Sequence, residues 1–233
     1  MANDVDLMLI ANVLPILLQY LPVTLEILVF SILFGMILGI VVALPKLLRI
    51  PILKQLGTIY ISFIRGTPIL IQLFLVFYGI PAILKLVHID VTRMDAIYFV
   101  IITYTLSNAA SFAEIFRAAI LTVERGQLEA ALSVGLTKSQ AFIRIILPQA
   151  LRVAFPNMSN TMISSLKDTS LAFSIGVMDM VGRGETLIAS STRALEIYLA
   201  LSVVYYFIVM LLERVLKRNE RYLNRYMKEI ATG

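Results

Sequence analysis

The sequence has no cysteine, no tryptophan and one histidine, and only 15% of its 233 residues are charged. Without cysteine the chain has neither a disulfide framework nor a thiolate metal site. With His88 as the only histidine, histidine-based metal sites and Ser/His or Cys/His triads are excluded as well. The composition therefore excludes these metal sites and these catalytic triads.

Apolar residues are abundant instead. They make up 59% of the chain, against roughly 45 to 50% in soluble globular domains. A soluble core of this size cannot hide so much aliphatic surface under so few charges. The sequence also has no long linker and no low-complexity tract. It therefore predicts one transmembrane domain over residues 1–233.

Five stretches are each about long enough to cross a hydrocarbon layer of roughly 30 Å. They cover residues 25–44, 66–84, 96–113, 153–178 and 197–212, and the last extends back to residue 194. The stretch 153–178 is broken by the adjacent charges Lys167 and Asp168. Residues 7–21 are also apolar but are interrupted by Pro15, and we interpret them as an interfacial helix. The expected fold class is an all-α membrane protein with about five transmembrane helices.

Lysine and arginine are distributed unequally between the two sides of these spans. Fifteen of the 20 fall on one side, and they include the basic tail of residues 217–233. Because basic residues accumulate on the cytoplasmic side, the N-terminus is expected outside and the C-terminus in the cytoplasm. The net charge of +5 then records topology and a contact with anionic lipid, and it does not indicate a nucleic-acid partner.

A cytoplasmic connection over about residues 122–150 is far longer than two neighbouring spans require. Residues 127–134 predict a short helix that Gly135 caps. Thr137 and Gln140 have capping-box spacing for a second helix, expected to end at Pro148. Two other interpretations of this segment are an amphipathic hairpin on lipid headgroups and a DNA-binding helix-turn-helix, which its few basic residues disfavour.

The same connection resembles the EAA loop of membrane subunits of ABC importers at every defining position. These are Glu129, Ala130, Ala131, Gly135, Ile145, Leu147 and Pro148. Other stretches resemble the polar amino acid permease branch of that family: 63–68 with 72–74, 113–117, 126–127, 166–171 and 212–214. The resemblance implies the fold of a type I ABC importer permease. It also implies coupling to an ATPase through Glu129, Ala130, Ala131, Gly135, Leu136, Leu147 and Pro148.

Several partners are implied by this resemblance. They are two cytosolic ATPases that use ATP and magnesium, a second identical or similar permease subunit, an extracellular solute-binding protein and a polar amino acid. The location would be the inner or plasma membrane of a bacterium. The chain has no G-x-x-x-x-G-K-[ST] phosphate loop, and glycine is never followed by lysine. ATP hydrolysis is therefore expected on another polypeptide.

Two polar stripes indicate a possible substrate pathway. At 100° per residue, Asn157, Asn160, Thr161, Ser164 and Asp168 fall within about 100° of one another. Thr103, Ser107, Ser111 and Glu114 fall within about 80°. The candidate pathway residues are Asn160, Ser164, Lys167, Asp168, Ser107, Ser111 and Glu114.

Other roles for these polar residues stay open. Small and hydroxyl residues also hold packed membrane helices together, and Glu114 with Arg117 has the spacing of a helix-surface pair. Lys167 has the chemistry of a gate element or of a counter-ion for Asp168. An ion-coupled secondary transporter that uses Glu114 and Asp168 is the alternative function. In the first span, Gly35 and Gly39 form a G-x-x-x-G pattern that predicts close helix packing within the subunit.

Overall fold

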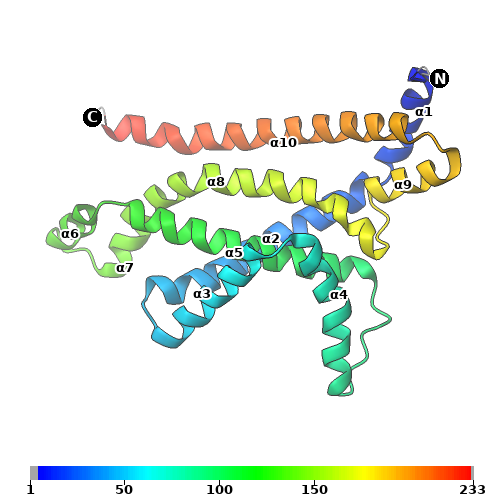
Figure 1. Cartoon of the computed structure of the whole chain (residues 1–233). Coiled ribbons are helices and arrows are strands. Elements are labelled where there is room, and N and C mark those ends of the chain that lie inside the picture. The colour runs from blue at the N-terminus through cyan, green and yellow to red at the C-terminus, as the bar shows by residue number, and fades with distance from the viewer. Residues whose placement is uncertain (1–4, 232–233) are drawn as a thin grey trace. The chain divides into compact units, whose positions relative to one another are not determined.

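The computed structural model describes residues 5–231, and side chains are described for residues 5–225. Within these residues every regular element is helical (Figure 1). The elements are α1 (Leu7–Leu18), α2 (Leu21–Leu47), α3 (Pro51–Gly66), α4 (Ile69–Leu86), α5 (Ala96–Thr122), α6 (Arg125–Ser133), α7 (Lys138–Ala141), the π-helix η1 (Phe142–Ile146), α8 (Leu147–Asp168), the 3₁₀-helix η2 (Thr169–Ile175), α9 (Met180–Ser191) and α10 (Ala194–Ala231).

Four of the described helices are long and apolar enough to cross a membrane: α2, α4, α5 and α10. They match four of the five expected spans. The fifth corresponds to α8 and η2, where the α-helix ends at Asp168 and a 3₁₀-helix continues to Ile175. Gly176 follows with a φ of 88°. The break expected at Lys167 and Asp168 is therefore a change of helix type.

The chain divides into two compact units. Unit 1 takes the described part of Met1–Leu33 with Thr67–Thr105 and Ile163–Leu212, and unit 2 takes Phe34–Gly66, Leu106–Met162 and the described part of Glu213–Gly233. The helices α2, α5, α8 and α10 each contribute to both units. Each unit is described by itself below.

Unit 1 has two apolar clusters. One joins α2, α4, α5 and η2 around Ile27, Leu73 and Tyr104. The other joins α1, α9 and α10 around Val13, Leu17 and Met180. The predicted helix near residues 7–21 is therefore present as α1 and half-buried, while its interfacial placement stays a prediction.

Pro15 does not interrupt α1, and that part of the expectation is wrong. The helix runs continuously from Leu7 to Leu18 with Pro15 inside it. Proline removes one backbone hydrogen bond from a helix interior. Here the helix gains support at its start, where the Asp6 carboxylate accepts hydrogen bonds from the backbone nitrogens of Met8 and Leu9 at 3.0 Å each. Burial of its apolar face in unit 1 adds tertiary support that periodicity alone does not reveal.

Unit 2 holds α3 and the last part of α2 against α5. A Cβ atom on Gly39 would lie 2.8 Å from Cβ of Phe112, so the contact between these two helices requires glycine. This confirms the expected packing within the subunit at Gly39. The Tyr60 hydroxyl on α3 donates a hydrogen bond to the Leu106 carbonyl on α5 at 2.6 Å. The helix α3 was not expected from the sequence, and the span expected from residue 66 begins at Ile69.

Candidate functional site

The helix α6 ends in a hydrogen-bonded reversal that depends on Gly135. The backbone nitrogen of Leu136 donates to the Ala131 carbonyl at 3.2 Å, and that of Gly135 donates to the Leu132 carbonyl at 3.1 Å. This pair of bonds is the Schellman motif, whose C′ residue adopts a left-handed conformation. Gly135 has a φ of 87°, and a Cβ there would meet nothing within 4 Å. Glycine is therefore required by the backbone conformation and not by lack of space.

The helix α7 begins directly after this reversal. The Gln140 backbone nitrogen donates to the Thr137 hydroxyl at 3.3 Å, and the Thr137 backbone nitrogen donates to the Gln140 side-chain oxygen at 2.9 Å. These two reciprocal bonds are the capping box expected from the sequence. Because α6 stops and α7 starts within four residues, the angle between them is fixed by backbone hydrogen bonds.

The second helix of this segment does not end at Pro148. It changes to the π-helix η1 over Phe142–Ile146 and then continues as α8, with Pro148 in the first turn. The Leu147 nitrogen donates to the Phe142 carbonyl, five residues earlier. A wider π turn relieves the contact between a proline ring and the preceding turn of an α-helix. The expectation of a helix end was wrong because it assumed a regular α-helix.

The candidate coupling residues are distributed over both faces of this segment. Ala131 is buried, with 2% of its surface exposed. Leu136 and Leu147 are half-buried. Glu129, Ala130, Gly135 and Pro148 are exposed. The Glu129 carboxylate makes no ion pair with another described residue, so its acidic group and the neighbouring Ala130 are presented outward together.

Glu114 is fully engaged by cations within unit 2. Its Oε1 is paired with Lys46 Nζ on α2, and its Oε2 accepts from Arg117 Nε at 2.8 Å and Nη2 at 2.7 Å. The side chains of Lys46 and Glu114 are 12% and 19% exposed. This three-residue network joins α2 to α5, and its geometry is that of a structural ion pair. The Arg117 contact has the expected i, i+3 spacing, whereas Lys46 as a partner was not foreseen.

Lys167 and Asp168 lie at the point where α8 becomes η2. The buried Tyr104 hydroxyl donates a hydrogen bond of 2.5 Å to the Asp168 backbone carbonyl, which ties this point to α5. Among the ion pairs of the described residues, none joins Lys167 to Asp168. The two adjacent side chains interact electrostatically but are not joined by a direct ion pair.

Lys167 lines a cavity of about 540 Å³ within unit 1. Hydroxyl groups from η2 and α10 share the lining, so a cation faces a partly polar, tyrosine-rich wall. The lining residues are Lys167, Ser170, Val181, Tyr198, Leu201, Ser202, Tyr205, Tyr206 and Val209. Of the candidate pathway residues, Lys167 alone belongs to this described cavity.

The remaining candidate pathway residues are accessible to different degrees. On α8, Asn160 and Ser164 are exposed; on α5, Ser107 and Ser111 are half-buried. Ser107, Ser111, Glu114 and Asn160 belong to unit 2, while Ser164, Lys167 and Asp168 belong to unit 1. Each set is therefore described within its own unit.

Comparison with known proteins bears directly on these features. Residues 35–225 match the family described as binding-protein-dependent transport system inner membrane component. The chain is 56% identical to the L-cystine transport system permease protein TcyL of Bacillus subtilis (strain 168) over 232 residues, covering 100% of this chain and 97% of TcyL. It is 45% identical to the probable amino-acid permease protein YxeN of the same strain, covering 90% of this chain and 92% of YxeN.

The chain belongs to this inner membrane component family.

The fold agrees with that membership. A solved structure titled as an amino acid ABC transporter with histidines superposes with a TM-score of 0.83 at 29% identity, covering 94% of this chain and 100% of that chain. The MetNI methionine ABC transporter, in an inward-facing crystal form, superposes with a TM-score of 0.72 at 19% identity and supports the fold alone. The protein is thus an all-α permease subunit of the type I ABC importer fold, located in the bacterial inner membrane.

Membership in the inner membrane component family also settles the kind of molecule. It is a non-catalytic subunit of an ATP-driven importer, and a partner ATPase hydrolyses the nucleotide. These findings support the importer and not the ion-coupled secondary transporter.

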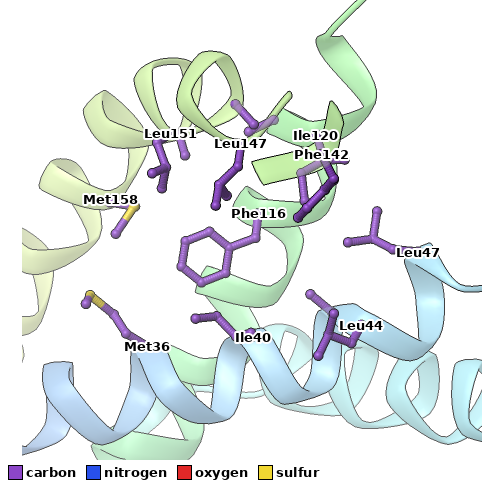
Figure 2. Close-up of a pocket in the computed structure, with 14 residues that line it drawn as sticks. Met36, Ile40, Leu44, Leu47, Phe116, Ile120, Phe142, Leu147, Leu151 and Met158 are labelled. Carbon is purple, nitrogen blue, oxygen red and sulfur yellow. The ribbon is translucent and has the colours of Figure 1, made fainter. Parts of the chain in front are cut away.

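An apolar cavity lies beside the start of α8 in this permease (Figure 2). It has a volume of about 380 Å³, and every lining side chain is hydrophobic. Figure 2 shows the Phe116 ring between Ile40 on α2 and residues Leu147 and Met158 on α8. Because a zwitterion needs charged or polar partners, this cavity does not suit an amino acid.

Sequence reasoning missed three groups that position the candidate site. They are Lys46, which pairs with Glu114; Tyr104, which bonds to Asp168; and the tyrosines around Lys167, including Tyr205. The only sequence signal for the third group was the presence of three tyrosines, Tyr198, Tyr205 and Tyr206, inside a largely aliphatic span. The first two contacts connect residues 68 and 64 positions apart, a separation that periodicity within one helix cannot reveal.

Proposed function

We propose that this permease carries a polar amino acid across the membrane and that its EAA loop, residues 122–150, docks on the separate ATPase. One observation supports the second part above all: the loop is a locally braced, outward-facing structure. A Schellman reversal and a capping box fix α6 against α7, and η1 continues α7 into α8 without an intervening coil.

Such a loop is suited to transmit movement. When the partner ATPases close on ATP, a displacement of α6 passes through α7 and η1 to α8 as a rigid-body shift. Glu129 and Ala130 supply the exposed contact, and the buried Ala131 with Gly135, Leu136, Leu147 and Pro148 maintains the shape behind it. No covalent chemistry is required of this chain, and ATP with magnesium would act only on the partner.

The orientation rests on the distribution of basic residues. Fifteen of 20 lysines and arginines lie on the side that includes the EAA loop and α10 beyond Leu212, which favours a cytoplasmic C-terminus. Cysteine placed at His88 should be labelled from outside, and cysteine placed at Lys138 only after lysis. Labelling in the reverse order contradicts the orientation.

For the pathway, we propose two sets of candidate residues, each within its own unit: Ser164, Lys167 and Asp168 in unit 1, and Asn160, Ser107 and Ser111 in unit 2. An α-amino acid carries both charges, and a carboxylate next to an ammonium, at the end of an interrupted helix, offers a partner for each. The tyrosine-rich cavity at Lys167 has the size of a small-molecule site, about 300–1,000 Å³. Glu114 is the weakest of the candidates because two cations already occupy its carboxylate.

The relative TcyL is named for L-cystine, which makes cystine the first cargo to test. Cystine is a double zwitterion, and the Lys167 ammonium with the several hydroxyl groups of this cavity suits its carboxylates. The complex would further contain a second permease, identical or similar, and an extracellular binding protein that delivers the amino acid. Uptake of radiolabelled cystine into proteoliposomes, competed by other unlabelled amino acids, tests this cargo.

The coupling proposal is tested by Glu129→Lys in reconstituted complexes. We expect ATP-driven uptake and binding-protein-stimulated ATP hydrolysis to become uncoupled, while the variant still inserts and assembles with the second permease. The matched control is Glu220→Lys, the same charge reversal on α10 outside the EAA loop, which should transport normally. Normal coupling in the Glu129 variant would overturn the assignment of this loop.

A further inference from the structure

A second polar cavity lies within unit 2, partly formed by the EAA loop and apart from the pathway candidates. Its volume is about 490 Å³, inside the range of small-molecule sites, roughly 300–1,000 Å³. It is lined by the end of α5 and the linker to α6, by the first turns of α6 and α8, and by α10. The lining residues are Thr122, Val123, Glu124, Gln127, Gln149, Arg152, Val153 and Asn224.

Two opposite charges line this cavity without meeting. The Nη1 atom of Arg152 is buried and has no hydrogen-bond partner. Glu124 is exposed, and no ion pair in the described part of the chain joins it to Arg152. A buried guanidinium donor without an acceptor is unfavourable unless another group supplies one. The arrangement therefore leaves room between an anionic and a cationic group for a molecule that carries both charges.

The other lining groups extend this complementarity. The Gln149 side-chain nitrogen already donates to the Ile145 carbonyl at 3.0 Å, and the Thr122 hydroxyl donates to the Ala118 carbonyl at 2.9 Å. The oxygens of both side chains remain available as acceptors for an ammonium group. The side-chain amides of Gln127 and Asn224 can donate to a carboxylate, and two valines provide an apolar wall.

We propose that this cavity is a second binding site, for a free α-amino acid on the cytoplasmic side. The α-carboxylate binds Arg152 in the two-pronged geometry of guanidinium pairs, and the α-ammonium binds Glu124. The cytoplasmic location and the cargo class rest on the proposed function. A ligand here bridges the start of α6 to the first turns of α8, so occupancy of this site and movement of the EAA loop are connected.

Charge-selective binding tests the proposal on the assembled complex of permease and ATPase in nanodiscs without the binding protein. The probes are L-glutamine, its deaminated acid glutaramate and its decarboxylated amine 4-aminobutanamide. The wild-type complex should bind glutamine more tightly than either analogue by about tenfold or more, since a hydrogen bond to a charged group contributes roughly 1.5–3 kcal/mol and 1.4 kcal/mol is a factor of ten.

Three variants assign this selectivity to the cavity. Arg152→Gln should lose the preference for glutamine over the amine, and Glu124→Gln the preference for glutamine over the acid. Arg152→Lys keeps the positive charge but not the two-pronged geometry, so it should retain part of the preference that Arg152→Gln loses, which shows that the fold is intact. The control Arg214→Gln removes an exposed arginine of α10, outside the EAA loop, that does not line the cavity and should bind as wild type.

Each outcome decides the matter. Selectivity that is unchanged in both Arg152→Gln and Glu124→Gln places glutamine elsewhere, for example in the membrane pathway, and overturns the site. Absence of glutamine binding in complexes that import an amino acid also overturns it and leaves the proposed function standing. If the permease alone binds glutamine and the assembled complex does not, the ATPase blocks the cavity. That result also overturns the proposal, because the site would then not function in the complex. Complexes with no ATP-driven amino acid uptake contradict the proposed function itself.

Discussion

The EAA loop and the polar stripes of α5 and α8 are held in place by different kinds of contact. In the loop, the bonds that shape it join residues three to five positions apart, from Ala131 to Leu136 and from Thr137 to Gln140. In the stripes, Glu114 depends on Lys46 and Asp168 on Tyr104, contacts that span 68 and 64 residues. The shape of the proposed coupling loop is therefore encoded locally, whereas the surroundings of the candidate pathway residues are created by the fold.

The largest effect is expected from Gly135→Val, which disrupts the locally bonded EAA loop. Valine at a φ of 87° is strained by about 1–3 kcal/mol, equivalent to roughly 5- to 150-fold in an equilibrium constant. We expect the rate of ATP-driven uptake to decrease by a factor within that range, while the variant still inserts into the membrane. Asparagine tolerates the left-handed region, so Gly135→Asn is the control, and equal uptake in the two variants would contradict a conformational role.

The next effect is expected at the ion-pair network, which represents the non-local side. Lys46→Met leaves the Glu114 carboxylate with Arg117 alone, and Glu114→Gln leaves Lys46 without its anion. Each should lower the free energy of unfolding of the subunit by about 1–3 kcal/mol. A double-mutant cycle by thermal unfolding in detergent should show strong coupling between them. If Glu114 instead contacts substrate, Glu114→Gln alone raises the KM of uptake.

A smaller effect is expected for Asp168→Asn, which removes a charge but keeps the shape and leaves the backbone carbonyl that Tyr104 binds. Uptake of a zwitterion should weaken several-fold through KM, with ATPase assembly intact. Asn160→Asp adds a carboxylate at an exposed position of α8. It tests whether uptake depends on a charge at residue 168 in particular or on a charge anywhere along the stripe. An unchanged rate and selectivity in the Asp168 variant removes this residue from the pathway.

The smallest effect is expected for Thr137→Ala, which deletes one half of the capping box. Loss of such a cap costs typically about 1 kcal/mol, and the Schellman reversal at Gly135 remains. We expect coupling to weaken by less than in Gly135→Val, measured as the ratio of cargo imported to ATP hydrolysed. Thr137→Ser retains the hydroxyl and should behave as wild type; a larger defect than in the glycine variant would reverse the ranking.

Much of this fold was predictable because long apolar runs in the sequence directly indicate membrane-spanning helices. The α2, α5 and α10 spans contain the expected stretches, and the capping residues Gly135 and Thr137 have the expected roles. The helices α3 and α9 were missed because neither is a long apolar run. In α9 the close approach of Gly184 to α10, where a Cβ would lie 2.7 Å from Leu201, reflects tertiary packing that no local pattern displays.

The site divides in the same way. The EAA residues form a motif whose spacing is itself the hydrogen-bond spacing of a helix end, so sequence and geometry coincide there. The partners of Glu114 and Asp168 come from other helices. The opposite charges at Glu124 and Arg152 share a cavity only because α6, α8 and α10 converge in unit 2, and their separation of 28 positions gives no hint of it.

The π-helix η1 sets the rotation of α6 and α7 relative to α8. A π turn holds one more residue than an α turn, so η1 shifts the direction in which α6 and α7 emerge relative to α8. If the five residues Phe142–Ile146 formed a regular α-helix instead, with none deleted, the exposed face of α6 would turn by up to about 100° around the α8 axis. A permease with that change would keep every motif in its sequence, but the exposed face of α6 would point in a different direction relative to α8.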